Sequence, residues 1–198
     1  MKNLVLILDF GSKFTHLIAK SVRLQNVYYE VIPYNTSAQE IKKKSPSGLI
    51  FSGSPYSIMD KNAPECDEKI FDLSIPILGI CYGMQVITDM LGGVVKHATK
   101  KEYGYNEIKI VRKNILLQGF SNNEIIWMSH SDFVEKTPEG FKVIACSKNT
   151  PISAMQNEDA RIYAVQFHPE VTHTEKVLKL FRNFLFKICI IKSECMQD

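Results

Sequence analysis

The sequence lacks the features that usually mark membrane, secreted or nucleic-acid-binding proteins. No apolar run is long enough to cross a bilayer, and the apolar residues 4–8 stop at Asp9, too early for a signal peptide. The 24 Lys and Arg residues are nearly balanced by 21 Asp and Glu residues, without a basic block of the kind that binds nucleic acids. We therefore expect a cytoplasmic protein that binds neither membranes nor nucleic acids.

Cysteines are few and are not spaced for a structural role. There are five, an odd number, and neither Cys-x-x-Cys nor His-Glu-x-x-His occurs. Neither a disulfide framework nor a metal site is therefore predicted. A length of 198 residues with 45% hydrophobic residues fits one domain with a substantial core. We expect this domain to span residues 1–190, followed by a C-terminal tail, 191–198.

Apolar runs alternate with helical patterns in the first half of the chain. Strands are predicted at 4–8, 28–32, 49–51 and 77–80, helices at 15–25, 38–44 and 82–91, and 63–73 is a further helix candidate. Such alternation is typical of parallel βαβ units. The pattern then changes to short strands at 93–95, 107–111, 125–128, 141–145, 152–155 and 162–167, before a final helix at 174–190. We therefore predict an α/β fold: an open mixed, mostly parallel sheet flanked by helices, with an antiparallel extension.

Cys81 lies between an apolar strand and a helix. The apolar residues 77–80 stop at Cys81, and the helical pattern 82–91 begins at the next residue. With Gly79 and Gly83 on either side, this is the sulfur counterpart of a nucleophile elbow, a sharp turn that exposes its side chain at the carboxyl end of a sheet. The helix N-terminus would favour a thiolate and stabilise a substrate oxyanion. On position alone, a small buried core cysteine is the alternative.

His168 and Glu170 follow another predicted strand. The apolar segment 162–167 ends at His168, and Pro169 stiffens the link to Glu170. Residues two apart in an extended segment point the same way, so the carboxylate can orient the imidazole. Each residue alone also fits an ordinary role, as a strand-end histidine or a solvated loop charge. A thiol with a distant histidine and an acidic residue is the arrangement used for nucleophilic acyl transfer.

Several short motifs resemble one protein family. Residues 79–85 (Gly-Ile-Cys-Tyr-Gly-Met-Gln) and 166–170 (Gln-Phe-His-Pro-Glu) are similar to the class I glutamine amidotransferase domain. Within that family, four further segments resemble the domains of GMP synthetases: 8–12, 102–105, 127–130 (Trp-Met-Ser-His) and 165–174. The resemblance covers about residues 4–189. It implies a flavodoxin-like fold.

The resemblance also implies a glutaminase. Cys81 would attack the side-chain amide of glutamine, His168 would transfer the proton and Glu170 would orient the imidazole, giving glutamate and ammonia. Backbone N–H groups of Ser54 and Tyr82 would form the oxyanion hole. The other implied substrate-binding residues are Gly53, Gln85, Ser129, His130 and Ser131.

Two positions depart from the family pattern. Ser54 replaces the second glycine of the usual Ser-Gly-Gly-Pro, and Ser131 stands where glycine often follows Ser-His. If position 54 needs a positive φ, a serine there costs on the order of 1 kcal/mol or more. A regulatory amidotransferase-like domain with weak turnover is therefore one alternative. Two others are a glutaminase that serves a different acceptor and a stand-alone γ-glutamyl hydrolase.

The implied ammonia needs a consumer. In GMP synthetases this is an ATP pyrophosphatase part that aminates XMP to GMP with ATP and Mg²⁺, through a Ser-Gly-Gly-x-Asp-Ser phosphate loop. Residues 52–57 of this chain lack the second glycine and the aspartate of that loop. No cofactor is therefore expected in this chain, and ATP and Mg²⁺ are expected only in the partner. The sequence leaves open whether that partner is another subunit or another domain.

Overall fold

Short runs of buried apolar residues form the parallel half of one sheet in the computed structural model, which describes residues 3–171 and 175–192. The parallel strands are β1 (Leu4–Asp9), β2 (Tyr28–Pro33), β3 (Gly48–Phe51), β4 (Ile77–Ile80) and β9 (Ile162–Val165). Side chains alternate between the faces of β1, so Leu4 and Leu6 join one apolar cluster and Val5 joins the other. Both faces of this half are therefore covered, as is usual for parallel sheets.

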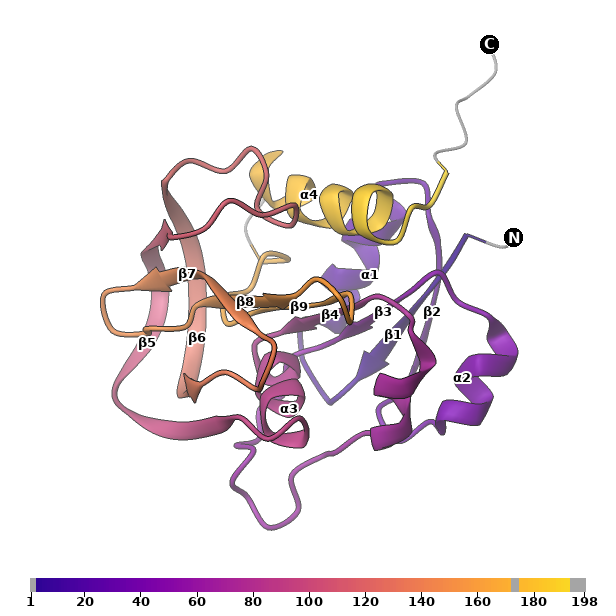
Figure 1. Cartoon of the computed structure of the whole chain (residues 1–198), viewed down its shortest axis with the longest axis horizontal. Helices are drawn as coiled ribbons and strands as arrows, with labels where there is room; N and C mark the ends of the chain where they lie inside the picture. The colour runs from indigo at the N-terminus through magenta and orange to yellow at the C-terminus, as the bar shows by residue number, and fades with distance from the viewer. Residues whose placement is uncertain (1–2, 172–174, 193–198) are drawn as a thin grey trace.

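The strands between α3 and β9 in sequence extend the sheet in antiparallel fashion. They are β5 (Val94–Ile110), β6 (Asn123–Lys136), β7 (Lys142–Ser147) and β8 (Ala154–Asn157). The complete order is β2-β1-β3-β4-β9-β8-β7-β5-β6 (Figure 1). Four neighbouring pairs are parallel and four are antiparallel. The predicted mixed α/β sheet with an antiparallel extension is confirmed.

β5 and β6 form a long two-stranded ribbon. The sequence pattern predicted it wrongly as three short strands. The predicted strands 93–95 and 107–111 are the two ends of β5, which is 17 residues long, and the predicted strand 125–128 is part of β6, which has 14. A register shift between His97 and Glu102 interrupts the pairing, and the residues around it are largely polar, so no apolar alternation marks the middle of β5. The motif 127–130 consequently lies inside β6 and not at a strand end.

Helices cover the two faces of the sheet in pairs. α1 (Thr15–Arg23) and α4 (Glu175–Arg182) lie on one face, where Ile18 and Phe181 pack into the same apolar cluster. α2 (Ala38–Lys44) and α3 (Tyr82–Met90) lie on the opposite face, where Ile41 and Met84 share the second cluster. Figure 1 shows the two pairs on opposite sides of the strands. The core is therefore divided into two apolar layers by the sheet.

Most predicted helices are confirmed, with differences at their ends. The predicted helix 174–190 is α4 followed directly by a π-helix, η2 (Asn183–Ile188), and Thr174 lies outside the described residues. The candidate helix 63–73 is reduced to a 3₁₀ helix, η1 (Glu68–Leu73). The reason is local, because the Asp67 side chain accepts a hydrogen bond from the Lys69 N–H at 3.1 Å and fixes the start of η1 there.

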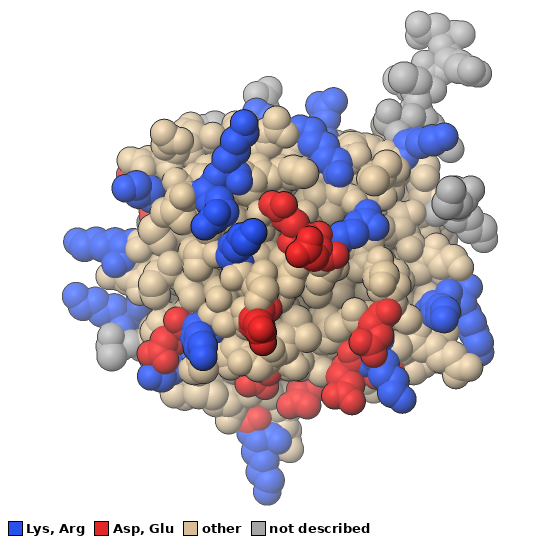
Figure 2. Space-filling view, viewed as in Figure 1, with Lys and Arg blue, Asp and Glu red and all other residues tan. Residues whose placement is uncertain are grey.

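The surface carries charges of both signs. On the face in Figure 2, basic and acidic side chains are both scattered between uncharged residues. Within the described ranges, no helix is long and apolar enough to span a membrane. Of the predicted tail 191–198, only Ile191 and Lys192 are described, and Ile191 is buried. Residues 193–198, like residues 172–174 of the family motif, lie outside the described part.

Candidate active site

Cys81 occupies the turn between β4 and α3, as the sequence pattern predicts. Its φ is 53° and its ψ is −104°, a conformation that costs a non-glycine residue about 1–3 kcal/mol. Such strain is typical of a nucleophile elbow. The Cys81 N–H donates to the carbonyl oxygen of Val165 at 2.8 Å, which ties the turn to the end of β9. The side chain is 5% exposed and faces the carboxyl edge of the parallel strands.

The two glycines beside Cys81 allow β4 and α3 to approach closely. A Cβ atom on Gly79 would lie 2.6 Å from Ile87 Cδ1 and 2.8 Å from the backbone of Gly83. A Cβ atom on Gly83 would lie 2.5 Å from the carbonyl oxygen of Phe51 in β3. Neither position has room for a side chain, so the turn itself requires both glycines.

His168 and Glu170 are brought together after β9. His168 Nδ1 lies 2.7 Å from Glu170 Oε1, and both side chains are buried. The expected extended segment is in fact a turn, in which the Val171 N–H reaches the His168 carbonyl oxygen at 3.4 Å. The sequence therefore predicts the contact correctly but not the backbone shape that makes it. Phe14 contacts the His168 ring edge-on, with 5.4 Å between the ring centroids.

The charge state of His168 depends on its two neighbours. Burial alone lowers its pKa, but the negative charges of Cys81 and Glu170, and hydrogen bonds to both, raise the pKa of His168 well above its usual value. His168 therefore keeps its proton at neutral pH when the Cys81 sulfur is a thiolate. The sulfur also has polar neighbours, since Gln166 Nε2 donates to it at 3.7 Å and the Ser129 carbonyl oxygen lies 3.8 Å away.

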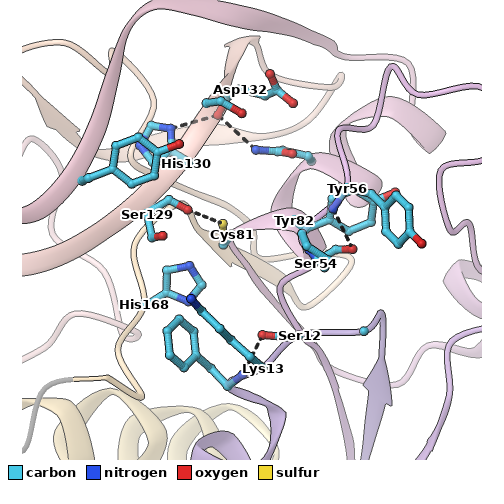
Figure 3. Close-up of a pocket in the computed structure, with 16 residues that line it drawn as sticks. Ser12, Lys13, Ser54, Tyr56, Cys81, Tyr82, Ser129, His130, Asp132 and His168 are labelled. Carbon is cyan, nitrogen blue, oxygen red and sulfur yellow. Dashed lines mark hydrogen bonds between the residues drawn. The ribbon is translucent and has the colours of Figure 1, made fainter.

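A cavity of about 300 Å³ opens over Cys81 (Figure 3). The predicted site residues that line it are Ser54, Cys81, Tyr82, Gln85, Ser129, His130, Ser131 and His168. Glu170 and Gly53 do not line the cavity. Glu170 lies behind the imidazole, and a Cβ atom on Gly53 would lie 3.2 Å from His168 Cε1, so Gly53 makes room for the histidine ring.

Other lining residues carry no predicted role. Residues 11–14, which follow β1, form one wall together with Tyr56, and Tyr103 and Asp132 contribute from β5 and β6. The rule that ligands lie outside the carboxyl ends of parallel strands applies to the loop after β1 and could have identified it. Tyr103 lies in the family-like motif 102–105, for which no site role is predicted, and Asp132 gives no signal, because both reach the cavity only through the pairing of β5 with β6.

The two departures from the family pattern do not strain the backbone. Neither Ser54 nor Ser131 is among the described residues with a positive φ. The cost considered for a serine at position 54 therefore does not arise. Ser54 Oγ instead accepts a hydrogen bond from the Tyr56 N–H at 3.3 Å (Figure 3), and Ser131 lies within β6.

Comparison with known proteins shows to which family the chain belongs. The model of the class I glutamine amidotransferases matches residues 6–188. The chain belongs to the class I glutamine amidotransferase family. A GMP synthase [glutamine-hydrolyzing] of Caldanaerobacter subterraneus is 47% identical to this amidotransferase over 98% of the chain, and one of Clostridium botulinum is 50% identical over 95%. The chain spans only about 38% and 37% of the length of these two relatives.

Solved structures agree with the fold of the amidotransferase. A Thermoplasma acidophilum protein, described as one subunit of a GMP synthase, superimposes with a TM-score of 0.81, at 27% identity and 94% coverage of both chains. A glutamine amidotransferase of Thermotoga maritima superimposes with a TM-score of 0.75 at 18% identity, which supports the fold alone. Within residues 3–171 and 175–192, no group of three or more His, Cys, Asp or Glu side chains is arranged to hold a metal ion.

Proposed function

We propose that this amidotransferase hydrolyses glutamine to glutamate and ammonia at Cys81. The observation that carries the proposal is the alignment of a strained elbow cysteine with the buried His168–Glu170 pair at one cavity. A cavity of about 300 Å³ matches the lower end of the range for small-molecule sites. A charge-separated Cys81–His168 pair supplies a nucleophile and an acid at neutral pH.

Each step of the reaction has a residue suited to it. The Cys81 thiolate attacks the amide carbon, and protonated His168 gives its proton to the leaving nitrogen as the C–N bond breaks and ammonia departs. A water then attacks the thioester, neutral His168 takes its proton, and the C–S bond breaks, which releases glutamate and restores the Cys81 thiolate beside protonated His168. Glu170 orients the imidazole through Nδ1. The oxyanion is proposed to lie near the N–H groups of Tyr82 and Ser54. Tyr82 begins α3, where the first N–H groups have no intrahelical partner, and Ser54 lines the same cavity.

The glutamine head groups are proposed to lie against β6. Ser129, His130 and Ser131 line the cavity opposite the elbow, and their backbone would receive the α-amino and α-carboxylate groups. Gln85 lines the same cavity and donates from Nε2 to the Asp132 carbonyl oxygen at 3.0 Å. Gln85 thus fixes the distance between α3 and β6 and helps to set the length of the pocket.

The acceptor of the ammonia is proposed from the relatives. Both of the GMP synthases named above carry, beyond the matched region, more than half of their length. We infer that an ATP pyrophosphatase domain or subunit uses the ammonia to aminate XMP to GMP, with ATP and Mg²⁺ bound there and not in residues 1–190. Free cysteines, including Cys81, fit a reducing compartment such as the cytoplasm.

A glutamine-analogue chloroketone tests the nucleophile. We expect it to modify Cys81 and to abolish glutamine hydrolysis, as Cys81→Ala would also do. Cys66→Ala is the matched control, because burial raises the pKa of the Cys66 thiol to about 12 and leaves it unreactive. His168→Ala should abolish turnover, whereas Glu170→Gln should retain measurable activity. Labelling of Cys66 in place of Cys81, or a fully active Cys81→Ala chain, would refute the proposal.

A further inference from the structure

A fully buried carboxylate lies behind the pocket and has no role in the reaction described above. Glu102 on β5 accepts hydrogen bonds from the Ser147 hydroxyl at 3.1 and 3.2 Å, from Asn149 Nδ2 at 3.4 Å and from the Thr150 hydroxyl at 2.5 Å. Its Oε2 lies 3.3 Å from Nε2 of His130, and both side chains are 2% exposed. Glu102 and His130 are directly opposed in the β5–β6 ribbon, where cross-strand pairs interact most closely.

The hydrogen bonds of His130 require a proton between these two residues. His130 Nδ1 lies 2.9 Å from the Asp132 carbonyl oxygen, which can only accept, so Nδ1 carries a hydrogen. A neutral ring would then present a lone pair at Nε2 to the carboxylate of Glu102. Two facing lone pairs in a buried site are unfavourable. A proton held by either group removes the conflict and gives Nε2 and Oε2 a hydrogen bond.

The surroundings of His130 lower its pKa overall, with burial as the largest cause. Burial lowers the pKa of His130, Glu102 and the Asp132 carbonyl act in the opposite direction, and the positive charge of His168 lowers it further. The Asp132 carboxylate is occupied by His97, whose Nδ1 lies 2.6 Å from Oδ1. Glu102 is therefore the carboxylate available to His130, and the shared proton belongs to the pair.

We propose that Glu102 is a positioning residue for glutamine, acting through a proton shared with His130 to hold residues 129–131 of β6 against the pocket. Nδ1 of His130 is bonded to the Asp132 carbonyl oxygen, and Nε2 is a buried atom that faces Glu102 Oε2 and has no other partner among the described residues, so the ring is directed at β5. The anchored segment includes the Ser129 carbonyl oxygen, 3.8 Å from Cys81 Sγ. Release of this strand would displace the cradle for the α-amino and α-carboxylate groups but not the elbow. This inference rests on the proposed glutaminase function.

Replacement of Glu102 should therefore change glutamine binding more than chemistry. We expect Glu102→Leu, of similar volume, to raise KM for glutamine about tenfold, since a buried polar atom left without its partner is costly, with kcat changed less than about twofold. Glu102→Gln should partly restore KM, because its amide N–H can donate to Nε2. Thr150→Val is the matched control: it removes a hydrogen bond to the same carboxylate without contacting His130, and it should leave KM nearly unchanged.

A double-mutant cycle separates positioning from a merely structural role. If Glu102 acts through His130, Glu102→Leu should have no further effect on KM in a His130→Asn chain. Equal effects of Glu102→Leu in both backgrounds, or a lower kcat with unchanged KM, would overturn the inference.

The ¹⁵N NMR spectrum of the wild-type His130 ring tests the shared proton directly. This measurement requires neither turnover nor a variant that folds. A protonated or strongly hydrogen-bonded Nε2 is expected, and a bare lone pair at Nε2 would overturn the shared proton. A wild-type chain that shows this Nε2 signal but does not hydrolyse glutamine would refute the proposed function alone.

Discussion

Cys81 combines a strained backbone with a buried side chain, and both features are held in place by contacts from other elements. Its N–H bond to Val165 and the close approach of α3 maintain the positive φ, which would otherwise relax at a gain of about 1–3 kcal/mol. The pKa of His168 depends on the electrostatics of the same site. Burial opposes its charge, but the negative charges of Cys81 and Glu170 outweigh burial and raise the pKa of His168. The charge state of His168 therefore depends on Cys81 and Glu170 being held beside it.

The pKa of His168 should fall when either negative neighbour is removed. In Cys81→Ala the largest favourable charge is lost while burial remains, so the cation is destabilised and His168 loses its proton at lower pH than in wild type. Glu170→Gln should shift the pKa in the same direction. The measurement is an NMR titration of the His168 ring, with exposed His16 in the same spectra as internal control. An unchanged or raised pKa of His168 in Cys81→Ala would contradict this account.

The elements differ in how well local sequence predicts them. β4, the elbow and α3 follow from an apolar run, a cysteine between glycines and a helical pattern, which all lie within about 15 consecutive residues. The β5–β6 ribbon does not, because its polar middle is specified by pairing with a strand far along the chain. This is why Cys81 and His168 could be predicted as site residues from the sequence, whereas Glu102, although part of the motif 102–105, has no predicted role and Asp132 is not singled out.

Gly83→Ala should destabilise the protein although alanine is the better helix former. In an ordinary helix the substitution would stabilise by about 0.5–1 kcal/mol, but here the new Cβ would lie 2.5 Å from the Phe51 carbonyl oxygen. We expect a loss of about 1–3 kcal/mol in the free energy of unfolding, as is typical of overpacking, with reduced glutaminase activity. Urea denaturation measures the loss. Asp89→Ala, at an exposed position of the same helix, is the control and should stay within about 0.5 kcal/mol of wild type.

Across the whole molecule, the two halves of the sheet contribute different parts of the site. The parallel half supplies Cys81 and His168 at its carboxyl edge, and the antiparallel half supplies the opposite wall through Ser129 to Ser131. The sequence predicts that the halves exist, since their strand spacing differs, but not that β6 reaches back over the elbow. The chain also matches only the part of its relatives that would produce ammonia, so we expect hydrolysis to be coupled to a consumer.

Addition of the remaining part of a related GMP synthase, with XMP, ATP and Mg²⁺, should raise the glutaminase kcat/KM of this chain about tenfold, within the usual range of coupling between sites. The reason is that an uncoupled glutaminase would waste glutamine. Steady-state glutamate release measures the effect, and the same addition to His168→Ala should give no stimulation. An unchanged rate together with separate elution of the two proteins in gel filtration would contradict coupling.

β9 is the last strand among the described residues, yet it lies in the centre of the sheet between β4 and β8. During synthesis on the ribosome, β4 therefore remains an open edge until residue 165 has emerged. Until then the Cys81 N–H has no Val165 carbonyl to bind, and neither half of the sheet is complete. Contacts between residues far apart in the sequence slow folding. The open edge of β4 can meanwhile pair with a strand of another chain, which leads to aggregation. The proposed Cys81–His168 pair is therefore assembled only when β9 is in place, so an unfinished chain lacks the proposed site.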